Sequence, residues 1–181
     1  MRLIPSMALF LSFAVLATPG GKSTPPAAAT VACDVELNVT DPDPKGLNVR
    51  SGPTGSAPVV AVIKKDGEWS SVHVTGQHGE WLSIDRGETI DDKVSEGVRP
   101  ALSRPGWVHV SRLGVSELST GSGTVLRDRP APDGKVLQRI KADDSRPTRV
   151  LGCKGKYIQV LHGGQSGWTD TWCNDERTTC S

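Results

Sequence analysis

The most constraining feature of this sequence is a pattern that recurs after 77 residues. The segment NVRSGPTGSAPVVAVI (48–63) aligns with VLRDRPAPDGKVLQRI (125–140), so that an Arg, a Pro and several apolar positions coincide. Two further blocks match in the same order: EWLSI (80–84) with KYIQV (156–160), and GWV (106–108) with GWT (167–169). Three matching blocks in one order indicate two copies of one small module.

Each copy has the pattern of short β-strands. Leu47 and Val49 alternate with polar neighbours, as do Leu82 and Ile84, and a period of two is typical of strands with one buried face. Gly and Pro separate these runs, and no window has a convincing helical period. The sequence therefore predicts an all-β fold in which two small, partly open barrels follow one another, at domains 33–115 and 124–181, joined by a linker at 116–123.

The first 17 residues are typical of a secretory signal peptide. One positive charge precedes an apolar run that is shorter than the ~20 residues of a membrane span. Cleavage is expected after Ala17, or as late as Ala29; the alternatives are a buried core helix and a lipid-anchored Cys33. Residues 18–32 are rich in Pro, Gly and Ala, which predicts a disordered tether. We therefore expect an exported protein, periplasmic or extracellular, with no stable membrane span in the mature chain.

The overall charge is close to neutral. The chain has 21 Lys and Arg against 20 Asp and Glu, a net charge of +1. A near-neutral chain carries no broad electrostatic footprint for nucleic acid or for an anionic membrane, so neither is expected as a partner.

Four cysteines in an exported chain predict two disulfides, and three pairings are possible. One of them joins Cys173 to Cys180 in a short C-terminal loop and ties Cys33, at the start of the folded region, to Cys153. Zinc is the rival interpretation, but zinc ligands usually come in close pairs such as CxxC, and the sequence has none.

The two copies differ in one place. Between WLSI and GWV the first copy has 21 residues where the second has LHGGQS. The difference predicts an insertion at about 86–105 in a loop between two strands. Such an insertion is either a solvated loop or a functional segment.

These blocks together resemble the bacterial SH3-like (SH3b) domain. The resemblance rests on LNVRSGP, VVAVI, EWLSI and GWVHVSRL in the first copy; the second copy is weaker, with VLRDRP and GWT in place of the usual runs. The family implies partly open barrels of five to seven strands, found in exported bacterial proteins that bind peptidoglycan or cell-wall peptides. Fold alone does not settle function.

The sequence offers no candidate catalytic cluster. The four histidines, His73, His78, His109 and His162, form no HxH or HxxxH pair, and no nucleophile elbow or phosphate loop is present. The acidic segment DPDP (41–44) lacks the ligand spacing of a Ca²⁺ loop and is better explained by turns. We therefore expect no metal, no cofactor and no enzyme activity.

Aromatic side chains are the best candidates for ligand contacts. If Leu82 and Ile84 face the core, Trp81 projects to the other face, and Tyr157 does so in the second copy. Trp107 and Trp168 each follow a Gly, which lets a ligand or another backbone approach. The alternative is that these rings cap small cores. An outward-facing Arg50 could hold a carboxylate or pair with a nearby Asp.

The sequence thus predicts a non-enzymatic exported binding protein. Its expected ligand is peptidoglycan or an extended peptide, bound near Trp81 and Trp107. The alternative is a periplasmic interaction module that binds another envelope protein as an inhibitor, assembly factor or spacer.

Overall fold

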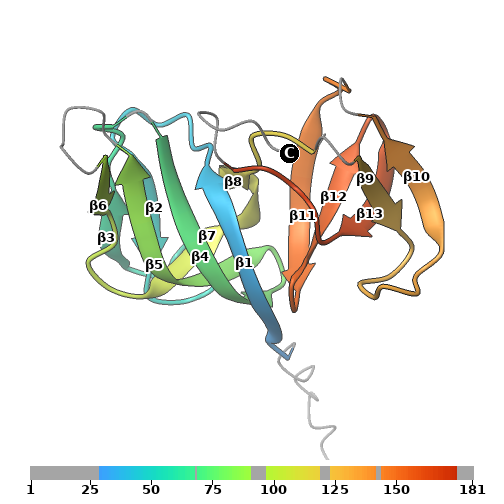
Figure 1. The fold of residues 1–181 in the computed structure, drawn as a ribbon. Coiled ribbons are helices and arrows are strands. Elements are labelled where there is room, and N and C mark those ends of the chain that lie inside the picture. Colours follow the sequence, from blue (N-terminus) through green and yellow to red (C-terminus); the bar gives the residue numbers. More distant parts are fainter. Residues whose placement is uncertain (1–28, 68, 91–96, 119–122, 142–143, 175–181) are drawn as a thin grey trace, which may run out of the picture.

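The computed structural model describes residues 29–67, 69–90, 97–118, 123–141 and 144–174. Within these ranges the chain forms thirteen strands and one short 3₁₀ turn, arranged in two antiparallel sheets that lie side by side (Figure 1). No helix in the described ranges is long and apolar enough to cross a membrane. The predicted signal peptide, most of the predicted tether and Cys180 lie outside the described residues.

The first module is an eight-stranded sheet formed by residues 31–114. Its elements are β1 (Val31–Val39), β2 (Leu47–Arg50), β3 (Val59–Ile63), β4 (Trp69–His78), β5 (Trp81–Ile90), β6 (Val98–Pro100), β7 (Gly106–His109), the 3₁₀ turn η1 (Val110–Arg112) and β8 (Leu113–Gly114). The path through the sheet runs β3-β2-β7-β5-β4-β1-β8, and β6 pairs with the far end of β5. β1 begins two residues before the expected domain start at Cys33.

The second module is a five-stranded sheet formed by residues 124–169. Its strands are β9 (Thr124–Arg127), β10 (Val136–Ile140), β11 (Thr148–Lys154), β12 (Tyr157–His162) and β13 (Gln165–Thr169), in the order β10-β9-β13-β12-β11. Neither path returns to its starting strand, so both sheets are open. The prediction of an all-β fold with two small, partly open units in tandem is confirmed.

The loop after β2 has the same backbone structure as the loop after β9. The Arg50 guanidinium donates to the carbonyl of Ala57 at 2.7 Å, and the Arg127 guanidinium donates to that of Gly134, also seven residues on, at 2.9 Å. Ser51 N–H bonds to the Pro58 carbonyl, and 77 residues later Asp128 N–H bonds to that of Lys135. The turn-rich repeat in the sequence is therefore one loop built twice, closed by its own arginine.

Each Gly-Trp dipeptide marks a close approach between two strands. A Cβ on Gly106 would lie 2.6 Å from the Arg50 carbonyl oxygen, and one on Gly167 would lie 2.7 Å from the Leu126 Cβ. Since real Cβ contacts are longer, only glycine lets β7 pass β2 and β13 pass β9. Of the two interpretations of these glycines, approach of another backbone is the one that the structure shows.

The inward-facing positions of the strands form the core. The largest fully buried side chains include Leu47, Val49, Leu82, Ile84 and Val108 in the first module. In the second module the buried Leu126, Ile158 and Val160 are the counterparts of Val49, Leu82 and Ile84, and Ile140 is also buried. All of them belong to one hydrophobic cluster that extends through both modules. The period of two that predicted the strands therefore also identified their buried faces.

The insertion in the first copy is partly sheet, which corrects the expectation of a loop at 86–105. β5 continues to Ile90, where it pairs with Trp69 of β4 and with Val98 of β6. Thr89 is buried, and its hydroxyl lies 2.8 Å from that of Ser70. The reason is geometric: β4 has ten residues, and β5 must be equally long to satisfy its backbone groups.

The segment predicted as a linker is fixed by hydrogen bonds at its beginning. Ser116 and Glu117 donate their N–H groups to the carbonyl of Cys173, and Cys173 N–H donates to the Glu117 carbonyl at 2.8 Å. Leu118 is only 2 % exposed. The start of the expected linker, 116–123, thus pairs with the end of the second module.

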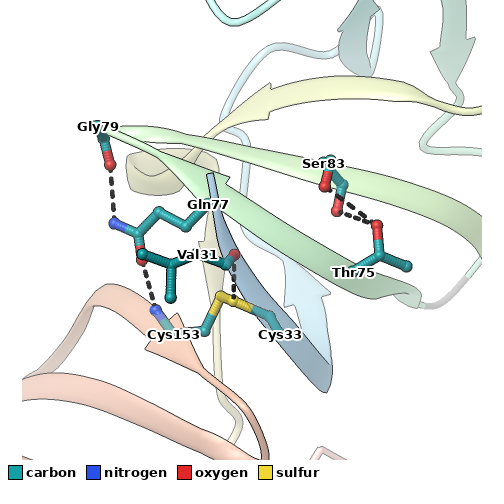
Figure 2. Close-up of a disulfide and its surroundings, with 7 residues drawn as sticks. All are labelled: Val31, Cys33, Thr75, Gln77, Gly79, Ser83 and Cys153. Atoms are coloured by element: carbon teal, nitrogen blue, oxygen red, sulfur yellow. Dashed lines mark hydrogen bonds between the residues drawn. A yellow bond between two sulfur atoms is a disulfide. The ribbon is translucent and has the colours of Figure 1, made fainter. Parts of the chain in front are cut away.

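A disulfide joins the two modules. It links Cys33 of β1 to Cys153 of β11 across 120 residues of sequence, which confirms one of the pairings considered (Figure 2). Cys173 is also disulfide-bonded, and Cys180, its expected partner, lies outside the described residues. Backbone hydrogen bonds from Asp34 N–H to the Gly155 carbonyl and from Gly155 N–H to the Ala32 carbonyl, both 2.8 Å, run beside the bridge.

Gln77 of β4 reinforces this contact between the modules. Its side-chain carbonyl accepts the N–H of Cys153 at 2.7 Å, while its amide nitrogen donates to the Gly79 carbonyl at 2.7 Å (Figure 2). A Cβ on Gly152 would lie 2.3 Å from the Gln77 side-chain oxygen. The glycine leaves room for the amide, which satisfies a buried backbone donor of the other module.

We expect Gln77→Ala to lower the free energy of unfolding by about 1–2 kcal/mol, because Cys153 N–H loses its partner in a buried site. Replacing both Cys33 and Cys153 by Ser should lower it by about 3–5 kcal/mol, because the bridge closes a long loop in the unfolded chain. Urea unfolding followed by circular dichroism measures both. Gln165→Ala is the control, since that exposed side chain bonds only to Ser166; equal effects of Gln77→Ala and Gln165→Ala would contradict a role in joining the modules.

His73 of β4 lies between two carboxylates from neighbouring strands. Its Nε2 is 2.9 Å from Asp34 of β1, and its Nδ1 is 2.7 Å from Asp85 of β5. The hydrogen bond to Asp34, followed by that to Asp85, raises the pKa of His73 above its ordinary value of 6.5, while burial and Arg86 oppose the rise. His73 is therefore a half-buried strand residue that bridges the carboxylates of the two neighbouring strands.

We expect the contribution of His73 to stability to depend on pH. A raised folded-state pKa means that the contribution is fully present below pH 6.5 and is lost as the pH rises through the folded-state value. The difference in unfolding free energy between wild type and His73→Gln should thus be larger at about pH 5.5 than at about pH 9. His78→Gln, which alters a histidine in the same strand outside the pair of carboxylates, serves as the control; an unchanged difference across this range would refute the expectation.

Candidate functional site

A cleft of about 650 Å³ opens on the first module. Its walls come from the segment after β1, from β2 and the loop after it, from the start of β5 and from the end of β7 with η1. The lining residues are Asp41, Pro42, Asp43, Leu47, Asn48, Arg50, Gly55, Trp81, His109, Ser111 and Arg112. Segments far apart in the sequence therefore supply an aromatic ring, two guanidinium groups and two carboxylates to one surface hollow.

Strand pairing brings Trp81 and His109 together. The two residues are directly opposite in the β5–β7 register, and side chains so paired lie on one face of the sheet. Their ring centroids are 5.3 Å apart and the rings are nearly perpendicular, at 87°. Such an edge-to-face contact holds the indole in place at the cleft.

The hydrogen bonds of His109 set its tautomer. Its Nδ1 accepts the backbone N–H of Ser111 at 3.3 Å and so caps the 3₁₀ turn. The same nitrogen lies 2.8 Å from the Ser111 hydroxyl. A ring nitrogen that accepts from a backbone N–H carries no proton, so the neutral ring bears its proton on Nε2. This Nε2 lies 3.7 Å from the Glu80 carboxylate.

The DPDP segment forms one wall through turn hydrogen bonds. The Asp41 carboxylate accepts the N–H of Asp43 at 3.1 Å, and that of Asp43 accepts the N–H of Lys45 at 2.9 Å. Asp41 also pairs with Arg112 at 3.4 Å, and its side chain is 10 % exposed against 45 % for Arg112. The interpretation of this acidic segment as turns is confirmed, and the turns leave Asp43 exposed at the cleft.

Two of the five predicted ligand residues line this cleft, namely Trp81 and Arg50. Arg50 is half-buried, with one nitrogen bonded to the Ala57 carbonyl. Trp107 pairs with both Arg50 and Ser83 in the sheet and so shares their face, but it is not among the lining residues. The structure therefore joins Trp81 to Arg50 at the site and leaves Trp107 beside it.

The other two predicted residues, Tyr157 and Trp168, belong to the second module and do not line the Trp81 cleft. Tyr157 is 5 % exposed, and burial, followed by the nearby Asp170 carboxylate, raises its pKa. Trp168 is half-buried and pairs with Arg127. Lys156 lies over the Tyr157 ring, 5.7 Å from its centroid, and pairs with Asp170 at 3.1 Å. Tyr157 is thus buried in the second module.

A second cavity, of about 470 Å³, lies at the β11 and β12 ends of the second module. It is lined by Pro147, Thr148, Arg149, Leu161, Gly163 and Gly164. None of these positions matches a lining residue of the first cleft under the 77-residue repeat. This second cavity is therefore not the counterpart of the first cleft.

Sequence reasoning missed His109, Arg112, Asp41 and Asp43 as parts of the site. For His109 a signal was available, since it alternates with Trp107 and so shares its face of β7. The pairing of β7 with β5, which places it opposite Trp81, required the three-dimensional register. Among the residues that the structure describes, no three His, Cys, Asp or Glu side chains gather as metal ligands.

Comparison with known proteins adds no assignment. No family model, no curated protein and no solved structure matches this chain.

Proposed function

We propose that this protein is an exported, non-enzymatic binding protein whose first module holds peptidoglycan or a cell-wall peptide in the Trp81 cleft. One observation carries the proposal: a half-buried aromatic ring, Trp81, which packs edge-to-face on His109, lines a cleft that also holds charges of both signs. The resemblance of the sequence motifs to bacterial SH3-like domains supports the same ligand class.

The chemistry of the cleft suits a ligand with both kinds of charge. A flat indole packs against a sugar ring or an extended peptide. Arg112 is only partly neutralised by Asp41 and can donate to a carboxylate, while the exposed carboxylate of Asp43 can accept an ammonium group. Cell-wall peptides carry carboxylates and amino groups beside sugar rings, which is the combination that such a cleft can recognise.

We expect the purified protein to co-sediment with isolated cell-wall sacculi. Trp81→Ala should lower the bound fraction at least fivefold, because it removes the aromatic wall of the cleft. Trp168→Ala, at a half-buried position of the second module, should leave binding within twofold of wild type.

Circular dichroism spectra matching wild type show that both variants are folded. If the protein stays in the supernatant at about 50 mM salt, or if both variants lose binding equally, the cleft is not a cell-wall site.

The second candidate is a module that binds another envelope protein through the extension of β5 and β6. One observation favours it: Val98 on β6 is 43 % exposed beside the paired ends of β4 and β5. The substitution Val98→Asp tests this candidate. Deletion of residues 86–103 is less suitable, because it would also remove the part of β5 that pairs with β4. Sacculi binding that is lost in Trp81→Ala and kept in Val98→Asp supports the first candidate over the second.

A further inference from the structure

The near-neutral charge of the whole chain conceals a difference between its halves. Residues 33–115 contain 9 Lys and Arg against 12 Asp and Glu, whereas residues 124–181 contain 10 against 7. The first half is thus net acidic and the second net basic. A prediction of binding partners from the net charge of the whole chain therefore misses the opposite net charges of its two halves.

Three of the basic side chains of the second module form a row along β10. Lys135, Arg139 and Lys141 occupy alternating positions with Leu137, and all four are exposed. Leu137 is 41 % exposed and lies between the cations of this row. Among the described residues none of the three cations has an ion-pair partner, whereas Arg129, Arg146 and Lys156 are paired with Asp133, Asp144 and Asp170.

The fold does not require this row. β3 is the counterpart of β10 under the 77-residue repeat. The register of β3 with β2 is the same as that of β10 with β9. Its residues at the four matching positions are Pro58, Val60, Val62 and Lys64. The same strand is therefore built with one cation in the first copy and with three in the second.

The backbone edge of β10 is available for pairing. β10 is the end strand of its sheet and pairs only with β9 among the described strands. It lies on the side of the second module that is remote from the first module (Figure 1). Unpaired N–H and C=O groups along such an edge can accept a further strand.

We propose that β10 is a docking edge for an extended acidic peptide segment of a partner protein, which adds to the second sheet as a sixth strand. β10 has a β-bulge between Val136 and Gln138 and is regularly paired from Gln138 to Ile140. Alternate residues of a strand are ~6.6 Å apart, so acidic side chains two positions apart in the peptide meet Arg139 and Lys141, while Lys135 lies on the other side of the bulge. An apolar side chain of the peptide packs on Leu137. Main-chain hydrogen bonds supply affinity, and the cations select the sequence.

The cations also decide against the simplest competing occupant. Charged side chains on an edge strand hinder pairing between identical copies, since each brings the same positive row. The same positive side chains that repel a second copy of β10 attract a strand with acidic side chains. This site is distinct from the Trp81 cleft, so its test and that of the proposed function are independent.

The probe is a fluorescein-labelled, end-blocked peptide of four Glu-Val repeats, measured by fluorescence anisotropy with the purified protein at about 50 mM salt. Binding is expected, and Arg139→Glu with Lys141→Glu should weaken it about tenfold or more. Lys45→Glu with Lys64→Glu changes the net charge equally on the first module and should change the affinity less than twofold.

A second peptide of the same composition, with its four Glu in one block, separates strand addition from general attraction to polyanions. The alternating peptide is expected to bind at least fivefold more tightly, and backbone amide signals of β10 should shift in NMR spectra when it binds. Equal binding of both peptides overturns the proposal, as does an unchanged affinity after the β10 charge reversal. It also fails if the protein sediments with phosphatidylglycerol vesicles and binds neither peptide.

Discussion

The close approach of β7 to β2 at Gly106 is the contact on which the first module and its cleft depend. A Cβ at this position would lie 2.6 Å from the Arg50 carbonyl oxygen, so only the missing side chain lets β7 lie this close to β2. β7 can then pair with β2 on one edge and with β5 on the other. That placement brings Arg50 of β2 to the same surface as Trp81 of β5 and His109 of β7. Gly167 makes the same approach possible in the second module, where β13 passes β9.

The fold could be predicted from the sequence because its signals are local. Alternation at Leu47 and Val49, or at Leu82 and Ile84, reports which side of a strand is buried, and this depends only on neighbours in the chain. The repeat then gave the number of modules. The insertion was misjudged because its strand character depends on β4: residues such as Gly87 and Thr89 pair only because a ten-residue strand lies beside them.

The candidate site was harder to predict because it depends on register and burial. Trp81 and Tyr157 occupy matching places in the two copies, yet Trp81 lines a cleft and Tyr157 is in the core. The surroundings decide this difference: the segment with Asp41 and Asp43 borders Trp81, whereas Lys156 and Asp170 lie against Tyr157. The opposite net charges of the two halves can be read from the sequence. That part of the positive charge lies along an edge strand, β10, can be seen only in the structure.

The disulfide also sets a condition on the order in which the chain can mature. Cys33 of β1 and Cys153 of β11 are separated by 120 residues, so in a chain that is synthesised from its N-terminus the bridge cannot form until the strands from β1 to β11 have been made. Until then the thiol of Cys33 has no partner in this bridge. Covalent closure at the first strand of the first module therefore depends on synthesis of the second module.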